Sequence, residues 1–219
     1  MDKRISVKEA IAKIGDGATV MVGGFNACGH PDLLVQTLLD NSTAKDLTLI
    51  SCDTGTDALS SGKLVASGRV KKIYSTYIGH NTATCRMLME DEESVVLVPQ
   101  GTFVERIRIA GAGIGGFLTK VGMGTIAAKG KQIVEVSGEQ YLLELPLAAD
   151  FALVWANVAD LYGNMRVLGT AKNFNTIMPA AAKVTIAVAE QVVEAIEPEE
   201  ITVPGLFVQH VVDGGDRSE

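Results

Sequence analysis

The chain has 219 residues and a formal net charge of -7, from 19 basic and 26 acidic side chains. Hydrophobic residues make up 47% of the chain and charged residues 21%, which excludes a disordered chain and predicts a packed core. The acidic balance, with no block of like charge, argues against a nucleic-acid-binding protein. At this length we expect one domain that spans residues 1–219.

The cysteines and the apolar runs bear on where the protein works. Cys28, Cys52 and Cys85 show no paired spacing, which favours free thiols in a reducing compartment over a disulfide framework. The first residues mix charged and small side chains and lack the apolar run of a signal peptide. Because no 18 apolar residues run together, we expect no membrane span and a cytoplasmic protein.

Apolar runs and helical patterns alternate along the chain. Ser6 and Glu9 have capping-box spacing at the start of a helix that we expect to reach Ile14. Apolar strands are predicted at residues 18–22, 47–51, 71–78, 94–98, 151–156 and 183–189, and further helices at 31–39, 81–89, 102–110 and 174–182. Strands that are apolar on both faces and alternate with helices indicate an α/β fold, an open and mostly parallel sheet with helices on both faces.

Residues 131–145 depart from this alternation. Their pattern, with Ser137 and Gly138 at the centre, predicts a local antiparallel hairpin. We find no internal repeat, low-complexity tract or linker.

The stretch VGGFNACGHP, residues 22–31, follows the first apolar strand. Gly23, Gly24 and Gly29 permit backbone angles and close approaches that a Cβ would prevent. Pro31 suits the first position of a helix, so the free N–H groups that follow it would form an anion site. Two interpretations remain open, a ligand-binding loop and a tight turn from strand to helix.

A second loop follows the strand at residues 94–98. Thr102 and Glu105 have capping-box spacing, so we expect the helix to begin at about Thr102 and to leave Gln100 in a short loop. An uncharged amide can stabilise an oxygen that gains negative charge. The alternative is a surface glutamine bonded to its own loop. Asp53 and Thr54, at the end of the second strand, could line the same cleft.

Other candidate motifs are weak. GAGIGG at residues 111–116 contains G-x-G-x-x-G, but it follows a helical pattern, so we expect a glycine-rich covering loop and no nucleotide site. Cys28 and His30 lack the partner pairs of a metal site, so no metal is expected. No side chain stands out as a nucleophile.

Residues 16–31, DGATVMVGGFNACGHP, resemble the signature of the alpha subunits of family I coenzyme A transferases. The similarity continues in VPQGT (98–102), GAGIGGFLTKVGMGT (111–125), LLELPLAAD (142–150) and KNFN (172–175), and so covers residues 16 to about 204. The most similar alpha subunits are those that act on acetate, butyrate, acetoacetate or another 3-oxoacid.

The resemblance implies an enzyme that works only with a beta subunit, in an α2β2 or larger heteromer. Such an enzyme moves coenzyme A from a short-chain acyl-CoA to a carboxylate acceptor. A glutamate in a Ser-Glu-Asn-Gly motif of the beta subunit forms a glutamyl-CoA thioester, and no such motif occurs in this sequence. The CoA thioester is a substrate, and no permanently bound cofactor is implied.

The resemblance also assigns residues. Gln100 would be the oxyanion donor, and the CoA-binding loop would comprise Gly23, Gly24, Phe25, Asn26, Ala27, Cys28 and Gly29. Asp53, Thr54, Gly101 and Gly113 are further candidates for the lining of the cleft.

The sequence departs from the family pattern at two places that bear on substrate preference. Cys52 stands where relatives commonly have asparagine, and His80 where a small residue is usual. Two alternative functions remain, a stand-alone enzyme similar to sugar-phosphate isomerases and a noncatalytic binding subunit. The first would need its own acid/base pair beside the loops, and we find none that is convincing.

Overall fold

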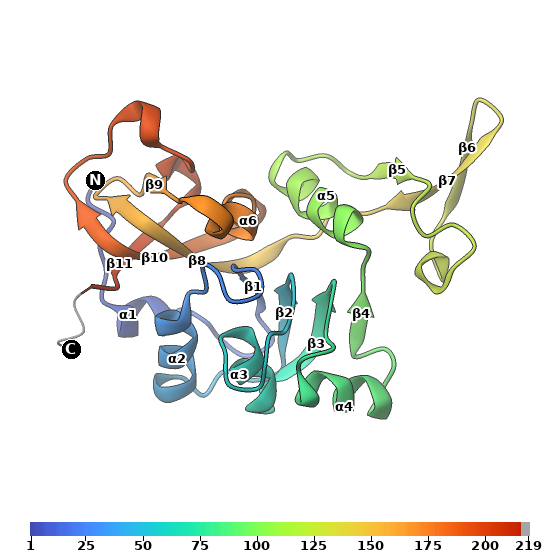
Figure 1. The fold of residues 1–219 in the computed structure, drawn as a ribbon, viewed down its shortest axis with the longest axis horizontal. Coiled ribbons are helices and arrows are strands. Elements are labelled where there is room, and N and C mark those ends of the chain that lie inside the picture. Colours follow the sequence, from blue (N-terminus) through green and yellow to red (C-terminus); the bar gives the residue numbers. More distant parts are fainter. Residues whose placement is uncertain (216–219) are drawn as a thin grey trace.

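The computed structural model describes residues 1–215 and is built around one large sheet (Figure 1). Its parallel strands follow the order β11-β10-β8-β1-β2-β3-β4, and the short β9 pairs antiparallel with β8. The strands are β1 (Thr19–Val22), β2 (Leu47–Ser51), β3 (Val70–Ser75), β4 (Val95–Leu97), β8 (Ala149–Asp160), β9 (Met165–Arg166), β10 (Ala182–Val193) and β11 (His210–Asp213). The mostly parallel α/β sheet expected from the apolar runs is confirmed.

Successive side chains of each strand point to opposite sides of the sheet, so each face carries apolar side chains. Helices cover both faces. Val20 of β1 packs in one core cluster with Leu34, whereas Met21 packs in the other with Phe103. The first cluster is covered by α1 (Val7–Ile11), α2 (Asp32–Asn41), α3 (Ser61–Ala66) and α4 (Thr82–Glu90), and the second by α5 (Gln100–Gly111) and α6 (Lys172–Asn175). Figure 1 shows α2, α3 and α4 in the lower part of the view and α5 and α6 in the upper part.

A second, three-stranded antiparallel sheet extends beyond β4, and we call residues 114–145 the arm (Figure 1). It consists of β5 (Phe117–Thr119), β6 (Ile133–Val136) and β7 (Glu139–Glu144), in the order β5-β7-β6. Ser137 and Gly138 join β6 to β7 with φ angles of 54° and 80°. Positive φ at both central residues is typical of a tight hairpin turn, so the predicted hairpin is confirmed.

Two helices have other boundaries than the capping patterns predict. The first helix begins after Ser6, whose hydroxyl accepts from the Glu9 N–H, but it ends at Ile11. Helix α5 begins at Gln100, because the Pro99 carbonyl already accepts from the Phe103 N–H at 2.9 Å. The carboxylate of Glu105 pairs with Arg108, so it is not free to complete a capping box at Thr102.

The helix predicted at residues 174–182 is wrong. Helix α6 ends at Asn175, a 3-10 turn follows at Met178–Ala181, and β10 begins at Ala182. Pro179 lies in that turn and has no N–H with which to continue a helical ladder. The remaining 3-10 turns are Ile126–Ala128, Gly169–Ala171, Pro198–Glu200 and Gly205–Phe207. Within residues 1–215, no helix is both long enough and apolar enough to cross a membrane.

Candidate functional site

A pocket of about 450 Å³ opens at the carboxyl ends of three neighbouring parallel strands. Segments that follow β1, β2 and β3 form its wall, together with the first residue of α5. Its lining comprises Phe25, Asn26, Cys52, Asp53, Gly55, Thr56, Leu59, Thr76, Tyr77, His80 and Gln100. Open parallel sheets bind ligands at this edge, so the pocket is the candidate site.

The loop after β1 forms a tight two-residue turn at the mouth of the pocket. Phe25 and Cys28 exchange two backbone hydrogen bonds, of 3.0 and 2.9 Å, and Asn26 between them has a φ of 52°. Side chains from Phe25 to Cys28 are exposed, whereas Gly23 and Gly24 are buried. The turn therefore presents residues 25–28 to solvent while its base is packed into the protein.

Side chains of the protein itself lie close to the glycines of this loop. A Cβ on Gly23 would lie 2.1 Å from Oδ1 of Asn175, and a Cβ on Gly29 would lie 2.7 Å from Nδ2 of the same residue. The Asn175 amide donates to the Gly29 carbonyl at 2.8 Å, and its Oδ1 accepts from the Trp155 N–H at 2.9 Å. Gly24, with a φ of 110°, packs against the ring of His30. The predicted close approach is real, and the packing of α6 against the loop explains it.

Asp53 links this turn to the end of β2 through hydrogen bonds. One carboxylate oxygen accepts from the Asn26 N–H at 2.9 Å, and the other accepts from the Gly55 N–H at 2.9 Å. Asp53 is the one carboxylate among the lining residues, all of which belong to the described part of the chain. These two hydrogen bonds hold the turn in position against the end of β2.

Gln100 is the first residue of α5 and is exposed at the pocket. The N–H groups of Gln100, Gly101 and Thr102 precede the first intrahelical hydrogen bond, so this end of the helix carries partial positive charge. The position differs from the short loop predicted by sequence, because the helix starts two residues earlier. The carboxamide therefore adds a neutral donor to a helix terminus that favours negative charge.

The other predicted lining residues do not all reach the pocket. Asp53 lines it, but Thr54 is buried behind it, with its N–H bonded to the Tyr77 carbonyl at 3.3 Å. Gly101 is exposed beside Gln100 without lining the pocket. Gly113, with a φ of 68°, follows the opposite end of α5, about 20 Å along the helix from Gln100. Gly113 does not line this pocket.

Tyr77 and His80 also line the pocket; the sequence had marked His80 only as a departure from the family pattern, and it had not marked Tyr77. The Tyr77 hydroxyl lies 3.5 Å from Nε2 of His80, and the two rings meet edge to face. His80 is the one residue with a basic side chain in the lining. Their position directly after β3 is the signal that could have found them, because the ends of parallel strands meet at one edge.

Cys52, at the end of β2, is buried and unreactive. Burial raises the pKa of its thiol to about 11, and the negative charge of Asp53 adds to this, while a hydrogen bond with Thr76 partly offsets it. The thiol therefore stays protonated at neutral pH. Cys28, by contrast, is exposed on the turn. Residues 1–215 contain no group of three or more His, Cys, Asp or Glu side chains arranged to hold a metal ion.

The fold and the pocket define an open α/β protein with a site at the carboxyl edge of its sheet. Residues 4–214 match the family described as Coenzyme A transferase. The chain belongs to the coenzyme A transferase family.

The sequence is similar to those of several known proteins over almost its whole length. The chain is 42% identical over 212 residues to the alpha subunit of the acetate CoA-transferase of Escherichia coli, which covers 96% of each protein. It is 46% identical over 199 residues to the acetoacetyl-CoA:acetate/butyrate CoA transferase alpha subunit of Clostridium acetobutylicum, covering 90% of this chain and 91% of the relative. Identity to one subunit of the succinyl-CoA:3-ketoacid coenzyme A transferase of Helicobacter pylori is 37% over 217 residues, covering 98% and 93%.

Solved structures share the fold. An acyl-CoA transferase of Escherichia coli O157:H7 superposes with a TM-score of 0.84 at 22% identity, covering 99% of this chain. This chain spans 48% of that protein. The glutaconate coenzyme A-transferase of Acidaminococcus fermentans gives a TM-score of 0.82 at 21% identity, covering 96% of this chain and 75% of that one.

Replacing Gly23 with alanine tests the packing of the loop. The new Cβ would meet the buried Asn175 side chain, so we expect Gly23→Ala to lower the free energy of unfolding by about 1–3 kcal/mol. Gly15→Ala is the matched control, because a Cβ at that position meets nothing within 4 Å. Urea denaturation of both variants measures the effect, and equal stabilities would show that the loop tolerates the extra carbon.

The two cysteines of the site should react differently. In the isolated chain at pH 8, we expect iodoacetamide to modify the exposed Cys28 and to leave the buried Cys52 unmodified. Mass spectrometry of peptides measures the order of labelling, and guanidinium should abolish the difference. Labelling of Cys52 at the rate of Cys28 in the folded protein would contradict this assignment.

Proposed function

We propose that this chain is the alpha subunit of a heteromeric enzyme that moves coenzyme A between a short-chain acyl-CoA and a carboxylate acceptor. The observation that carries the proposal is a pocket with a neutral amide donor on a helix terminus and a carboxylate that is already hydrogen-bonded to the backbone. The names of the most similar relatives, which act on acetate, butyrate or 3-ketoacids, support the same substrate class.

The nucleophile has to come from another chain. Asp53 accepts two backbone hydrogen bonds and its displacement would release the turn at Asn26. The Cys52 thiol is protonated at neutral pH, because burial raises its pKa to about 11. The glutamate that the sequence resemblance assigns to a beta subunit would supply the missing carboxylate.

In the proposed reaction, that glutamate attacks the thioester carbonyl of acyl-CoA. The carbonyl π electrons move to oxygen, and collapse of the adduct breaks the carbon–sulfur bond to give an acyl-glutamyl anhydride and CoA thiolate. The thiolate then attacks the glutamyl carbonyl and releases the carboxylate product, which leaves a glutamyl-CoA thioester. The acceptor carboxylate reverses these steps. Each addition develops an oxyanion, to which the Gln100 amide would donate.

An amide suits this place better than a charged group. A lysine or arginine at position 100 would pair with the incoming glutamate before reaction and lower its nucleophilicity. A glutamine donates to the developing oxyanion without such a pair, and the terminus of α5 adds a fixed partial charge of the right sign.

We also propose that the turn at residues 25–28 borders the coenzyme A. Its side chains are exposed at the pocket mouth, and Phe25 and Asn26 line the pocket itself. The CoA thioester is then a substrate that enters and leaves, and an α2β2 or larger assembly completes the site. The cytoplasm is the expected compartment.

Gln100→Ala tests the assignment of the oxyanion donor. With a complementing beta subunit, we expect turnover to fall by about two powers of ten, because one oxyanion donor typically contributes about 3 kcal/mol. The affinity for the beta subunit should stay unchanged. Gln191→Ala, at an exposed glutamine of β10 outside the pocket and outside the arm, is the control and should remain fully active. Transfer from butyryl-CoA or acetoacetyl-CoA to acetate is the assay.

The same assay separates the alternatives. Activity of the chain alone would favour a stand-alone enzyme, and tight assembly without transfer in any mixture would favour a noncatalytic role. A Gln100→Ala variant as active as the parent would show that the donor is elsewhere.

A further inference from the structure

One face of the arm is apolar and uncovered. In the antiparallel register, Leu118 of β5 lies opposite Leu143 of β7, and Val134 of β6 lies opposite Tyr141. Cross-strand partners and alternate residues share a face. The apolar arm face therefore consists of Leu118, Val134, Val136, Tyr141, Leu143 and Leu145. None of these residues is buried, and Leu118, Val136 and Leu145 are 40%, 44% and 56% exposed.

The opposite face of the same sheet is packed at one end. Leu142 is fully buried there, next to Gly122 of the segment that joins β5 to β6. Glu144 is also buried on this side, and its carboxylate pairs with Lys131 and lies 3.9 Å from Nε of Arg106. The arm thus buries side chains on one face of its sheet and fully buries none on the apolar arm face.

Exposed apolar side chains are concentrated in the arm. Of the 15 large apolar residues that are exposed in the described chain, seven lie within residues 114–145: Ile114, Leu118, Val121, Ile126, Ile133, Val136 and Leu145. Monomers rarely expose contiguous apolar patches of this kind, except where another molecule binds.

The charged groups on the apolar arm face neutralise one another. Lys120 pairs with Glu139 at 2.8 Å and lies over the Tyr141 ring, whose hydroxyl donates to Glu139 at 2.7 Å. A neutral apolar face does not suit a nucleic acid or an anionic lipid surface, which basic patches bind. It suits the apolar centre of a permanent protein interface.

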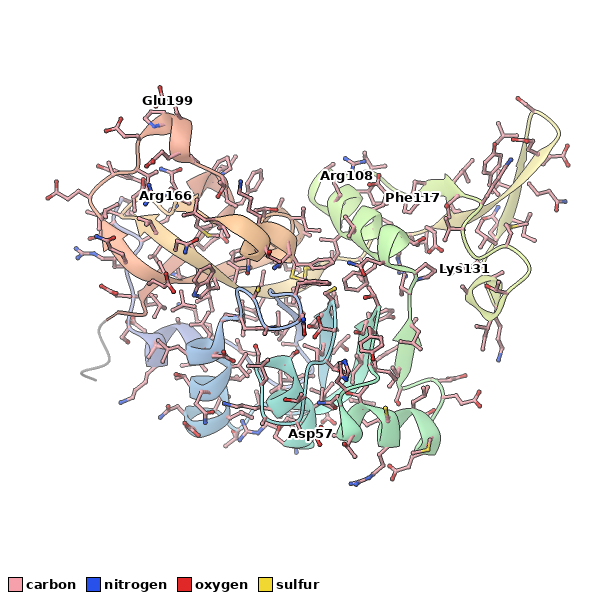
Figure 2. The ribbon with its side chains drawn as sticks, in the orientation of Figure 1. Asp57, Arg108, Phe117, Lys131, Arg166 and Glu199 are labelled. Atoms are coloured by element: carbon pink, nitrogen blue, oxygen red, sulfur yellow. The ribbon has the colours of Figure 1, made fainter. Side chains whose placement is uncertain are left out.

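The arm is fixed to the helix that carries Gln100. Arg106 of α5 donates from Nε to the Leu145 carbonyl at 2.8 Å, and its own carbonyl accepts from the Leu147 N–H at 2.9 Å. Figure 2 labels Arg108 on α5, and Phe117 and Lys131 on the arm. Arg106 lies about 9 Å along the helix from Gln100, so Leu145 and the pocket are within the span of one docked protein.

We propose that the apolar arm face is a docking surface for the beta subunit that supplies the catalytic carboxylate. The inference rests on the proposed function, because the pocket needs a carboxylate from a second chain beside Gln100. A protein placed there reaches the root of the arm, and the apolar arm face, whose charged groups pair with one another, offers it an apolar contact without net charge. A second copy of this chain would leave the pocket without its nucleophile.

Placing a single charge on the apolar arm face tests the proposal in the full chain. We expect Leu118→Lys and Val136→Lys each to raise the Kd for a beta subunit that contains the Ser-Glu-Asn-Gly motif by about 30-fold or more, as at an interface hot spot. Ile133→Lys is the matched control. Ile133 is 53% exposed on the same sheet, but it pairs with Leu142 and so belongs to the opposite face. Its Kd should stay within about threefold of the parent.

Calorimetry gives the Kd, circular dichroism and urea midpoints confirm that each variant folds, and sedimentation gives the oligomeric state. When the beta subunit is saturating, turnover of Leu118→Lys should return to the parental value, because the arm face makes no contact with substrate. Unchanged affinity in both variants would overturn the proposal, as would failure of every such beta subunit to bind the parent chain. Conversion of a parental homodimer to a monomer, with affinity for the beta subunit unchanged, would assign the face to self-association.

The outcome for docking is independent of the outcome for catalysis. If the complex forms and Leu118→Lys weakens it while the parent complex transfers no coenzyme A, the docking surface holds and the proposed function fails. If transfer occurs and the two variants bind as tightly as the parent, the function holds and the docking surface fails.

Discussion

Two hydrogen bonds that Asp53 accepts hold the mouth of the pocket together. They tie the turn after β1 to the end of β2, and they involve the one carboxylate among the lining residues. What remains is a surface of donors, apolar side chains and one imidazole. Under the proposed function, such a surface would bind and polarise a thioester, and the attacking carboxylate would come from a second chain.

The glycine loop depends on a second constraint, which is steric. Asn175 joins the loop, through the Gly29 carbonyl, to the Trp155 N–H of β8, and only a residue without a Cβ fits at Gly23 beneath it. Glycines in such a loop are commonly attributed to a ligand. Here the base of the loop is shaped by internal packing, which fixes the exposed residues 25–28 in one position. Under the proposed function, the ligand would meet the tip of the turn, and the glycines would act by holding that tip in place.

Local sequence predicted the strands and the hairpin, because apolar runs and the Ser137-Gly138 pair act through neighbouring residues. It failed where specific side-chain contacts or a proline outweigh the residue spacing. Thr102 and Glu105 have capping spacing, but Arg108 takes the glutamate and Pro99 starts α5 earlier. The apolar spacing of residues 174–182 is helical. However, the Asn175 side chain donates to the Gly29 carbonyl, 146 residues away in sequence, and Pro179 has no N–H with which to continue a helical hydrogen-bond ladder. Gly113 belongs to a stretch that resembles the family pattern. It follows the C-terminal end of α5, however, whereas Gln100 is the first residue of that helix. The pairing of Tyr77 with His80 has no periodic signal at all.

Helix α5 bears the proposed oxyanion donor and also contacts the arm. Its first residue presents the amide, its free N–H groups add positive charge at the same point, and its Arg106 holds the root of the arm. A helix of 12 residues therefore carries the donor and also holds the root of the arm that bears the proposed docking face. Effective donors to an oxyanion must be in place before charge develops, since reorienting them during the reaction costs free energy. Under the proposal, a protein that docks on the arm is positioned relative to the same helix that bears Gln100. Docking would then also place the nucleophile beside the donor, although the two groups belong to different chains.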